Sequence, residues 1–137
     1  MNIIHQTQPT ENSCVSTTIA MILSIPVENV VEEFHERYFE MQSISVSEYL
    51  FSKGVRTIPG LTSCMRLEWE RVYLLCVPSI NEVAAFHSLL VDTRGQEPVI
   101  YDPAMGREGK KYYVLQDPEN ELEIKLKAYN IHYEVMP

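Results

Sequence analysis

The sequence predicts an α+β fold in a single domain over residues 1–137, with helices first and an antiparallel sheet after them. Apolar residues recur at helical spacing in the first part of the chain, and apolar, β-branched runs separated by turn signals fill the rest. The chain is 45% hydrophobic, which is enough at this length to bury a core without disulfides or metal ions. No internal repeat or linker divides it.

The first helix is expected to follow a polar loop. Pro9 and the polar residues 10–13 oppose regular structure, and Ser13 is placed to cap the helix that begins after it. Pro26 ends this helix. Its apolar positions nearly surround it, which predicts burial on almost every side: Val15, Ile19, Ala20, Met21, Ile22, Leu23 and Ile25.

Two further helices are predicted. Pro26 suits the first turn of a helix whose apolar stripe is Val27, Val30, Val31, Phe34 and Tyr38. Ser45 and Glu48 form a capping-box pattern, and Gly54 is a favourable residue just past a helix end. Together they predict a short helix over residues 46–53.

Strand-like composition predicts most of the remaining elements. The segment from the Pro59-Gly60 turn to Glu70 has no clear pattern, and residues 65–70 are compatible with one helical turn. The expected strands cover residues 55–58, 72–77, 85–92, 98–102, 111–115 and 131–135.

The segment after Asp117 carries two competing patterns. Asp117 can cap a helix and Pro118 can occupy its first turn, followed by Leu122, Leu126 and Tyr129 at helical spacing. Residues 122, 124 and 126 also alternate as they do in a strand. The capping signals decide the prediction in favour of a helix that ends before Asn130.

Composition and charge exclude several functions. The formal charge is -8, and phosphate affinity needs clustered basic residues, so no nucleic-acid partner is expected; only Arg107, Lys110 and Lys111 cluster. No apolar run reaches the about 18 residues that span a bilayer, and no signal-peptide pattern is present, which indicates a cytoplasmic protein without a membrane partner. The oligomeric state stays open.

The cysteine content also agrees with a cytoplasmic protein. Three cysteines without regular spacing suit a reducing compartment rather than a disulfide framework. Cys64 is expected in a loop and Cys76 in a buried strand. No cysteine or histidine pair has zinc-ligand spacing, so neither a metal nor another cofactor is expected.

Cys14 stands where the polar loop becomes a buried helix. Unpaired N–H groups and the positive end of the helix dipole favour an anion there, so a thiolate would be stabilised and its pKa lowered. This placement predicts a nucleophile. The alternative is an ordinary small buried residue, which is what most free cysteines are.

His87 lies in an otherwise apolar strand, and Asp102 ends the next one. A turn within residues 93–96 places Asp92 opposite Glu97 and therefore His87 opposite Asp102, with Cβ atoms about 4.5–5.5 Å apart on one face. An aspartate there would orient the imidazole and fix its tautomer. The competing interpretation is a core histidine satisfied by a buried carboxylate.

These residues resemble a known pattern. In papain-like cysteine peptidases of the branch typified by bacteriocin-leader peptidase domains, a Gln precedes the catalytic Cys at a helix start, a His opens a later strand, and an Asp-Pro-x-x-Gly segment follows. Here Gln8 is separated from Cys14 by five residues, Phe86-His87 precedes an apolar run, and the last segment reads Asp102-Pro103-Ala104-Met105-Gly106.

The resemblance implies a papain-like fold and hydrolysis of a peptide or related amide through a thioester acyl-enzyme, with a peptide or protein as substrate. It makes Cys14 the nucleophile, His87 the general base and acid, and Asp102 the orienting residue. It also implies that the Gln8 side chain joins the Cys14 backbone N–H in the oxyanion hole. Spacing favours Gln8 over Gln6 for that donor role.

The chain departs from the family at two positions. Ser13 stands where the family usually has Asp, and Val15 stands where it has Gly, so a branched side chain would narrow the space beside the thiol. Deamidation or acyl transfer would use the same thioester with a different acceptor. A non-catalytic protein-binding module is the remaining alternative.

Overall fold

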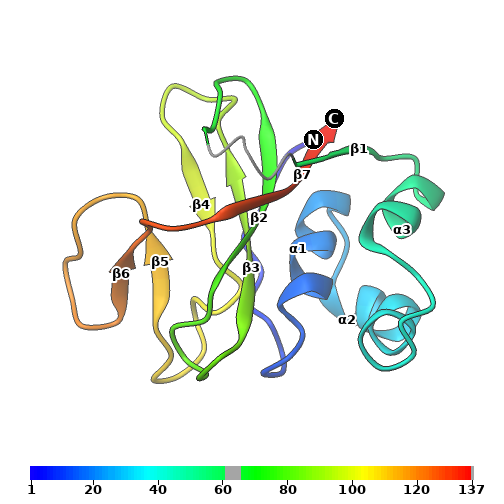
Figure 1. The fold of residues 1–137 in the computed structure, drawn as a ribbon, viewed down its shortest axis with the longest axis horizontal. Helices are drawn as coiled ribbons and strands as arrows, with labels where there is room; N and C mark the ends of the chain where they lie inside the picture. The colour runs from blue at the N-terminus through cyan, green and yellow to red at the C-terminus, as the bar shows by residue number, and fades with distance from the viewer. Residues whose placement is uncertain (61–65, 137) are drawn as a thin grey trace.

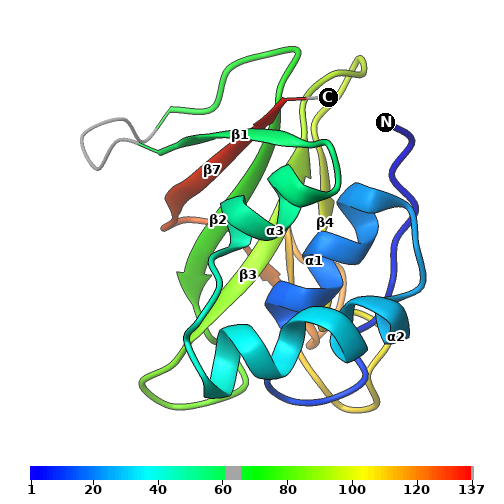
Figure 2. The ribbon, with the colours of Figure 1, turned by 90° about the vertical axis from the view of Figure 1, so that its right-hand side faces the viewer.

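The computed structural model describes residues 1–60 and 66–136 as an α+β arrangement (Figures 1 and 2). Helical segments cover one face of a five-stranded antiparallel sheet, and a two-stranded parallel sheet lies beyond its other face. The helical elements are α1 (Cys14–Leu23), α2 (Val27–Val30), η1 (Val31–Glu40) and α3 (Val46–Ser52). The strands are β1 (Arg56–Pro59), β2 (Val72–Pro78), β3 (Phe86–Asp92), β4 (Val99–Tyr101), β5 (Tyr112–Val114), β6 (Glu123–Lys125) and β7 (Asn130–Met136).

Helix α1 begins at Cys14, as its sequence predicts. Ser13 occupies the N-cap position, but its hydroxyl is bonded to the backbone N–H and C=O of Thr10, so the predicted side-chain cap is absent. Ser13 instead closes the preceding turn. The helix is buried from Ser16 to Ile22 and ends at Leu23, and the C-cap residue Ser24 has a left-handed conformation.

The predicted second helix begins as α2 and continues as η1, a π-helix. Its i→i+5 bonding is visible at the end of the segment, where the Met41 N–H donates to the Glu36 carbonyl. In a π-helix, the residues four and five positions further along both lie about one turn away. Tyr38 and Phe39 therefore both lie about one turn beyond the fully buried Phe34. The rings of Phe34 and Tyr38 stack 5.0 Å apart.

Helix α3 confirms the short helix that its capping residues predict. The Ser45 hydroxyl accepts from the Glu48 N–H, and the Glu48 carboxylate accepts from the Ser45 N–H, which is the complete capping box. Gly54 follows the helix with φ of 86°, a conformation that glycine adopts without steric cost.

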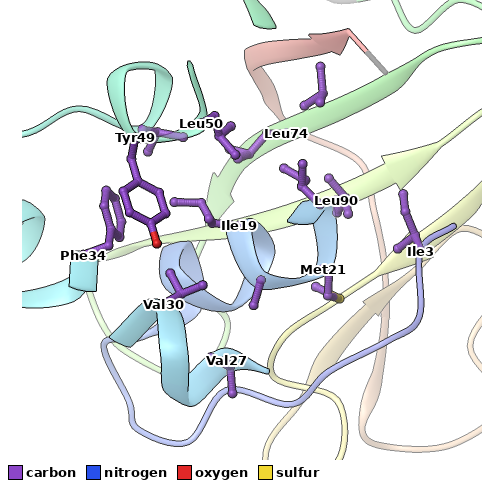
Figure 3. Packing of buried hydrophobic residues seen from close by; sticks show 14 of the residues in the cluster. Ile3, Ile19, Met21, Val27, Val30, Phe34, Tyr49, Leu50, Leu74 and Leu90 are labelled. Carbon is purple, nitrogen blue, oxygen red and sulfur yellow. The ribbon is translucent and has the colours of Figure 1, made fainter. Parts of the chain in front are cut away.

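The main core lies between the helices and the sheet (Figure 3). Ile19 of α1 and Leu50 of α3 face Leu74 of β2 and Leu90 of β3, and all four side chains are fully buried. A second cluster lies on the other face of the sheet, where Ile124 of β6 packs with residues that include Leu75 and Leu89. The strand order is β1-β7-β2-β3-β4.

The predicted register of the β3–β4 hairpin is wrong by two residues. Asp92 pairs with Val99 instead of Glu97. The loop is longer than predicted because the Asp92 carboxylate accepts hydrogen bonds from the backbone and side chain of Arg94 at the start of the turn, and because Pro98 has no N–H to pair. A two-residue shift keeps every side chain on the predicted face.

The predicted helix after Asp117 is also wrong. Asp117 accepts from the Lys125 ammonium instead of capping a helix, and the segment contains β6, which pairs in parallel with β5. The alternating pattern prevails because it brings Ile124 and Leu126 together into the second cluster. The prediction that the C-terminal strands form one antiparallel sheet is also wrong for β5, which lies outside the antiparallel sheet.

The segment before β2 was compatible with a helical turn at residues 65–70. Of this segment, residues 66–70 are described and form no helix. They end in a turn at Trp69-Glu70, where the Glu70 N–H donates to the Thr93 carbonyl. Met65 and Cys64 lie outside the described residues.

In the described parts of the chain, no single helix is both long and apolar enough to cross a membrane. The segments Cys14–Leu23 and Val27–Glu40 together have the length and apolar composition of a membrane-spanning helix. The chain bends by 117° at the break between them.

Candidate active site

The fold brings three of the predicted site residues into one interacting group. Cys14 is the first residue of α1, His87 lies near the start of β3, and Asp102 follows the last residue of β4. Cys14 and His87 line the same cavity, and hydrogen-bonding and charge interactions between them shift the pKa values of both side chains. His87 Nε2 lies 2.6 Å from Asp102 Oδ1, which leaves Nδ1 of the ring for the sulfur.

Asp102 meets His87 although the two residues are not directly paired in the ladder. The regular pairing of β3 with β4 ends at Leu90 and Tyr101, so Asp102 extends beyond it on the same face as His87. The Asp102 side chain is only 2% exposed. It accepts further bonds from the backbone N–H of Ala104, at 2.8 Å, and of Tyr113, at 2.7 Å. Three donors therefore compensate its burial and hold it in place.

The electrostatics of the site favour a charged pair. Burial alone lowers the pKa of His87, but the hydrogen bonds and charges of Asp102 and Cys14 outweigh burial and raise it to about 9. Burial alone raises the pKa of Cys14, but the hydrogen bond and charge of His87, with backbone N–H bonds from Ser88 and Val15, lower it below its usual value. Both shifts favour thiolate and imidazolium over the neutral forms.

The pair stands on the wall of a cavity of about 340 Å³. Val15 lines it beside the thiol, as its position in the sequence predicts. Segments distant in the sequence contribute the rest of the wall: Gln8, Glu11, Asn12, Tyr38, Phe39, Cys76, Ser79, Asn81, Glu82, Ala85, Phe86, Ser88, Arg107, Lys110 and His132.

Gln8 lines this cavity, but its side-chain amide is already occupied. Nε2 donates to the Thr10 carbonyl at 2.7 Å and to the Glu11 carbonyl at 3.2 Å, while Oε1 is buried without a hydrogen-bond partner among the described residues. The rival Gln6 lies elsewhere. Its amide links the Ile25 carbonyl to the Val27 N–H between α1 and α2, which is a structural role.

The cavity residues that sequence reasoning missed as parts of a site include Tyr38, Phe39, Cys76 and His132. Tyr38 belongs to the predicted apolar stripe of its helix, whereas Phe39 lies outside that stripe. Cys76 was expected to be buried, but it is half-buried on the cavity wall. No local signal in the sequence distinguishes His132 from an ordinary strand residue.

Within residues 1–60 and 66–136, no group of three or more His, Cys, Asp or Glu side chains could hold a metal ion. Comparison of the chain with protein-family models, with curated proteins and with solved structures finds no match. A functional conclusion therefore depends on the geometry and chemistry of the site itself.

Proposed function

We propose that the protein is a cysteine peptidase of papain-like fold that hydrolyses a peptide or related amide bond. One observation carries the proposal: Cys14 and His87 interact on the wall of a cavity, and the buried Asp102 carboxylate binds the His87 ring from behind it. Their order along the chain and their elements agree with the resemblance, namely a Cys at a helix start, a His on a strand and an Asp after the next strand.

The acylation step follows from this arrangement. The Cys14 thiolate attacks the carbonyl carbon of the substrate, and the resulting oxyanion collapses to a thioester as the C–N bond breaks. The His87 imidazolium donates its Nδ1 proton to the departing amine. Asp102 holds the ring so that Nδ1 faces the sulfur and stabilises the positive charge of the ring before the proton leaves.

Deacylation restores the resting state. Neutral His87 removes a proton from a water molecule, the hydroxide attacks the thioester carbon, and the C–S bond breaks to release a carboxylic acid and the Cys14 thiolate. Because a protein amine in place of water would give acyl transfer, and a glutamine side chain as the acylating amide would give deamidation, these reactions share the same site.

We assign the oxyanion to the backbone N–H of Cys14 and the side chain of Gln8. Helix α1 has no side-chain cap, which agrees with a first turn that offers N–H groups to an anion. A half-turn of the Gln8 amide about its last carbon–carbon bond would exchange Nε2 and Oε1 and supply the second donor. That rotation gives up the bonds to Thr10 and Glu11, so it needs the oxyanion as a replacement acceptor.

The test has two parts that separate catalysis from a non-catalytic binding module. Iodoacetamide at pH 6.5 should alkylate Cys14 at least about tenfold faster than Cys76, because each pKa unit changes the thiolate fraction tenfold and burial and the Cys14 charge raise the pKa of Cys76. Equal labelling would favour the binding module.

A mixed peptide library is then incubated with the wild type and with Cys14→Ala, and the products are identified by mass spectrometry. Peptide cleavage by the wild type alone is expected. Gln8→Glu keeps the shape of the side chain but removes the donor, and should lower kcat by about 10²–10³-fold without slowing alkylation. Cleavage that survives Cys14→Ala would show that the proposed nucleophile is wrong.

A further inference from the structure

Strand β7 contains one residue more than its partner at the level of the cavity. Leu74 of β2 pairs with Tyr133, and the next residue, Leu75, pairs with Ile131, so His132 is an inserted residue. Neighbouring side chains of a regular strand point to opposite faces. Here the rings of His132 and Tyr133 lie 4.3 Å apart, so the bulge turns both toward the same side.

Gly60 holds the bulge in place. Its N–H donates to the His132 carbonyl at 3.0 Å, just beyond the end of β1. A Cβ atom at residue 60 would lie 1.8 Å from the Ile131 carbonyl oxygen, and this contact with backbone excludes any side chain. The close approach of the two chains therefore requires glycine.

The bulge places His132 on the cavity wall beside two other neutral polar groups, Tyr38 and Cys76. Burial and the nearby charge of Cys14 raise the pKa of both residues, which puts them close to the nucleophile and uncharged at neutral pH. Burial lowers the pKa of His132, which favours its neutral form. Among the described residues, no side-chain hydrogen bond occupies the Tyr38 hydroxyl or the His132 ring.

Apart from the Cys14–His87 pair, the charged residues of the cavity lie on segments other than η1, β2 and β7. Glu11, Glu82, Arg107 and Lys110 all lie on loops, outside the helices and strands. The residues that η1, β2 and β7 contribute carry imidazole, phenol, thiol and phenyl groups. This part of the wall therefore offers hydrogen-bond donors and acceptors but no counterion.

We propose that His132, Tyr38 and Cys76 form a substrate subsite beside Cys14 that selects an uncharged hydrogen-bonding side chain, the carboxamide of glutamine or asparagine. The neutral imidazole and the phenol each present one donor and one acceptor, which matches the oxygen and the NH₂ group of a carboxamide. A carboxylate or ammonium finds no opposite charge on these residues, and an apolar side chain leaves their polar groups unpaired. The subsite rests on the proposed function, because it presents substrate to Cys14.

The test uses short peptidyl vinyl sulfones that react without turnover. The Cys14 sulfur adds to the vinyl carbon, and His87 gives its proton to the neighbouring carbon, so the product is a stable thioether. The side chain is varied at each of the two residues before the vinyl group in turn. At each position, three reagents are compared, which carry glutamine, glutamate or methionine there and are otherwise identical. Mass spectrometry measures the alkylation rate of Cys14.

At one of the two positions, the glutamine reagent should react about tenfold faster than the other two, the difference that one or two hydrogen bonds make. His132→Phe should abolish this preference, so that the glutamine reagent reacts no faster than the methionine reagent. Tyr38→Phe, which removes only the hydroxyl, should reduce the preference and serves if His132→Phe fails to fold. The control is His35→Phe, because His35 is stacked on Phe39 and bonded to Ser16 but does not line the cavity.

Equal rates for the three reagents, or faster reaction of the glutamate or methionine reagent, would refute the subsite and leave the proposed function intact. A glutamine preference that persists in both His132→Phe and Tyr38→Phe would also refute it. If Cys14 reacts with none of the reagents and is no more reactive than Cys76 toward iodoacetamide, the proposed function and the subsite are both wrong.

Discussion

Replacing Asp102 with asparagine tests the link between His87 and its buried acceptor. The substitution keeps the shape of the side chain but removes a charge 2.6 Å from the His87 ring nitrogen. Asp102 now accepts from three N–H groups, those of His87, Ala104 and Tyr113. An amide has one acceptor oxygen, so in either orientation its NH₂ group faces a backbone N–H. One buried donor is then unpaired, which should lower the free energy of unfolding by about 1–3 kcal/mol.

The effect on the thiol follows from the pKa of His87, whose side chain is 11% exposed. Its rise from 6.5 to about 9 corresponds to about 3 kcal/mol in favour of the imidazolium, and the Asp102 hydrogen bond is the largest raising cause. Without that charge, burial drives the pKa of His87 back toward or below 6.5. Cys14 then loses its cationic partner, and the pKa of the thiol rises.

The assay is iodoacetamide alkylation of Cys14 at pH 6.5, with urea unfolding measured on the same samples. The rate should fall at least about tenfold in Asp102→Asn, because each unit of pKa changes the thiolate fraction tenfold. Peptide hydrolysis should fall by about 10²–10⁴-fold in kcat/KM. Asp92→Asn is the matched control, since Asp92 lies on the strand of His87 but pairs with Arg94. A folded Asp102→Asn protein that is alkylated at the wild-type rate would refute the reasoning.

Two further predictions concern pH and the bulge. Because the pKa of His87 is raised, its charge should be present at neutral pH and lost only as the pH rises through about 9; a ring titration near 6.5 in the NMR spectrum would contradict the ion pair. Gly60→Ala should lower the free energy of unfolding by about 1–3 kcal/mol, because its Cβ meets the Ile131 carbonyl oxygen. The control Gly95→Ala meets only the Glu97 carbonyl oxygen at 3.8 Å, and equal losses by urea unfolding in the two variants would count against the clash.

Features with short-range causes could be predicted from the sequence. The capping box of Ser45 and Glu48, the left-handed Gly54 and the helix start at Cys14 each depend on residues within one turn of one another. The face shared by His87 and Asp102 was also predictable, because strand periodicity survives a register error of two residues.

Features with long-range causes could not be predicted. Strand β6 replaces the expected helix because packing on the far face of the sheet outweighs a capping signal near Asp117. The orientation of the Gln8 amide depends on carbonyl groups in the loop before α1, which only a folded loop brings into range. His132 reaches the cavity through a bulge that Gly60 pins from another strand.

The sequence by itself determined which groups were available for chemistry and the face on which most of them lie, because helix caps, turns and side-chain periodicity act over a few residues. Only the tertiary structure decided how those groups meet. The bond between His87 and Asp102, the charge balance at Cys14 and the neutral wall around His132 all depend on contacts between distant segments. Register, bulges and burial arise when the whole core packs, and they set both the distances and the pKa shifts of the candidate site.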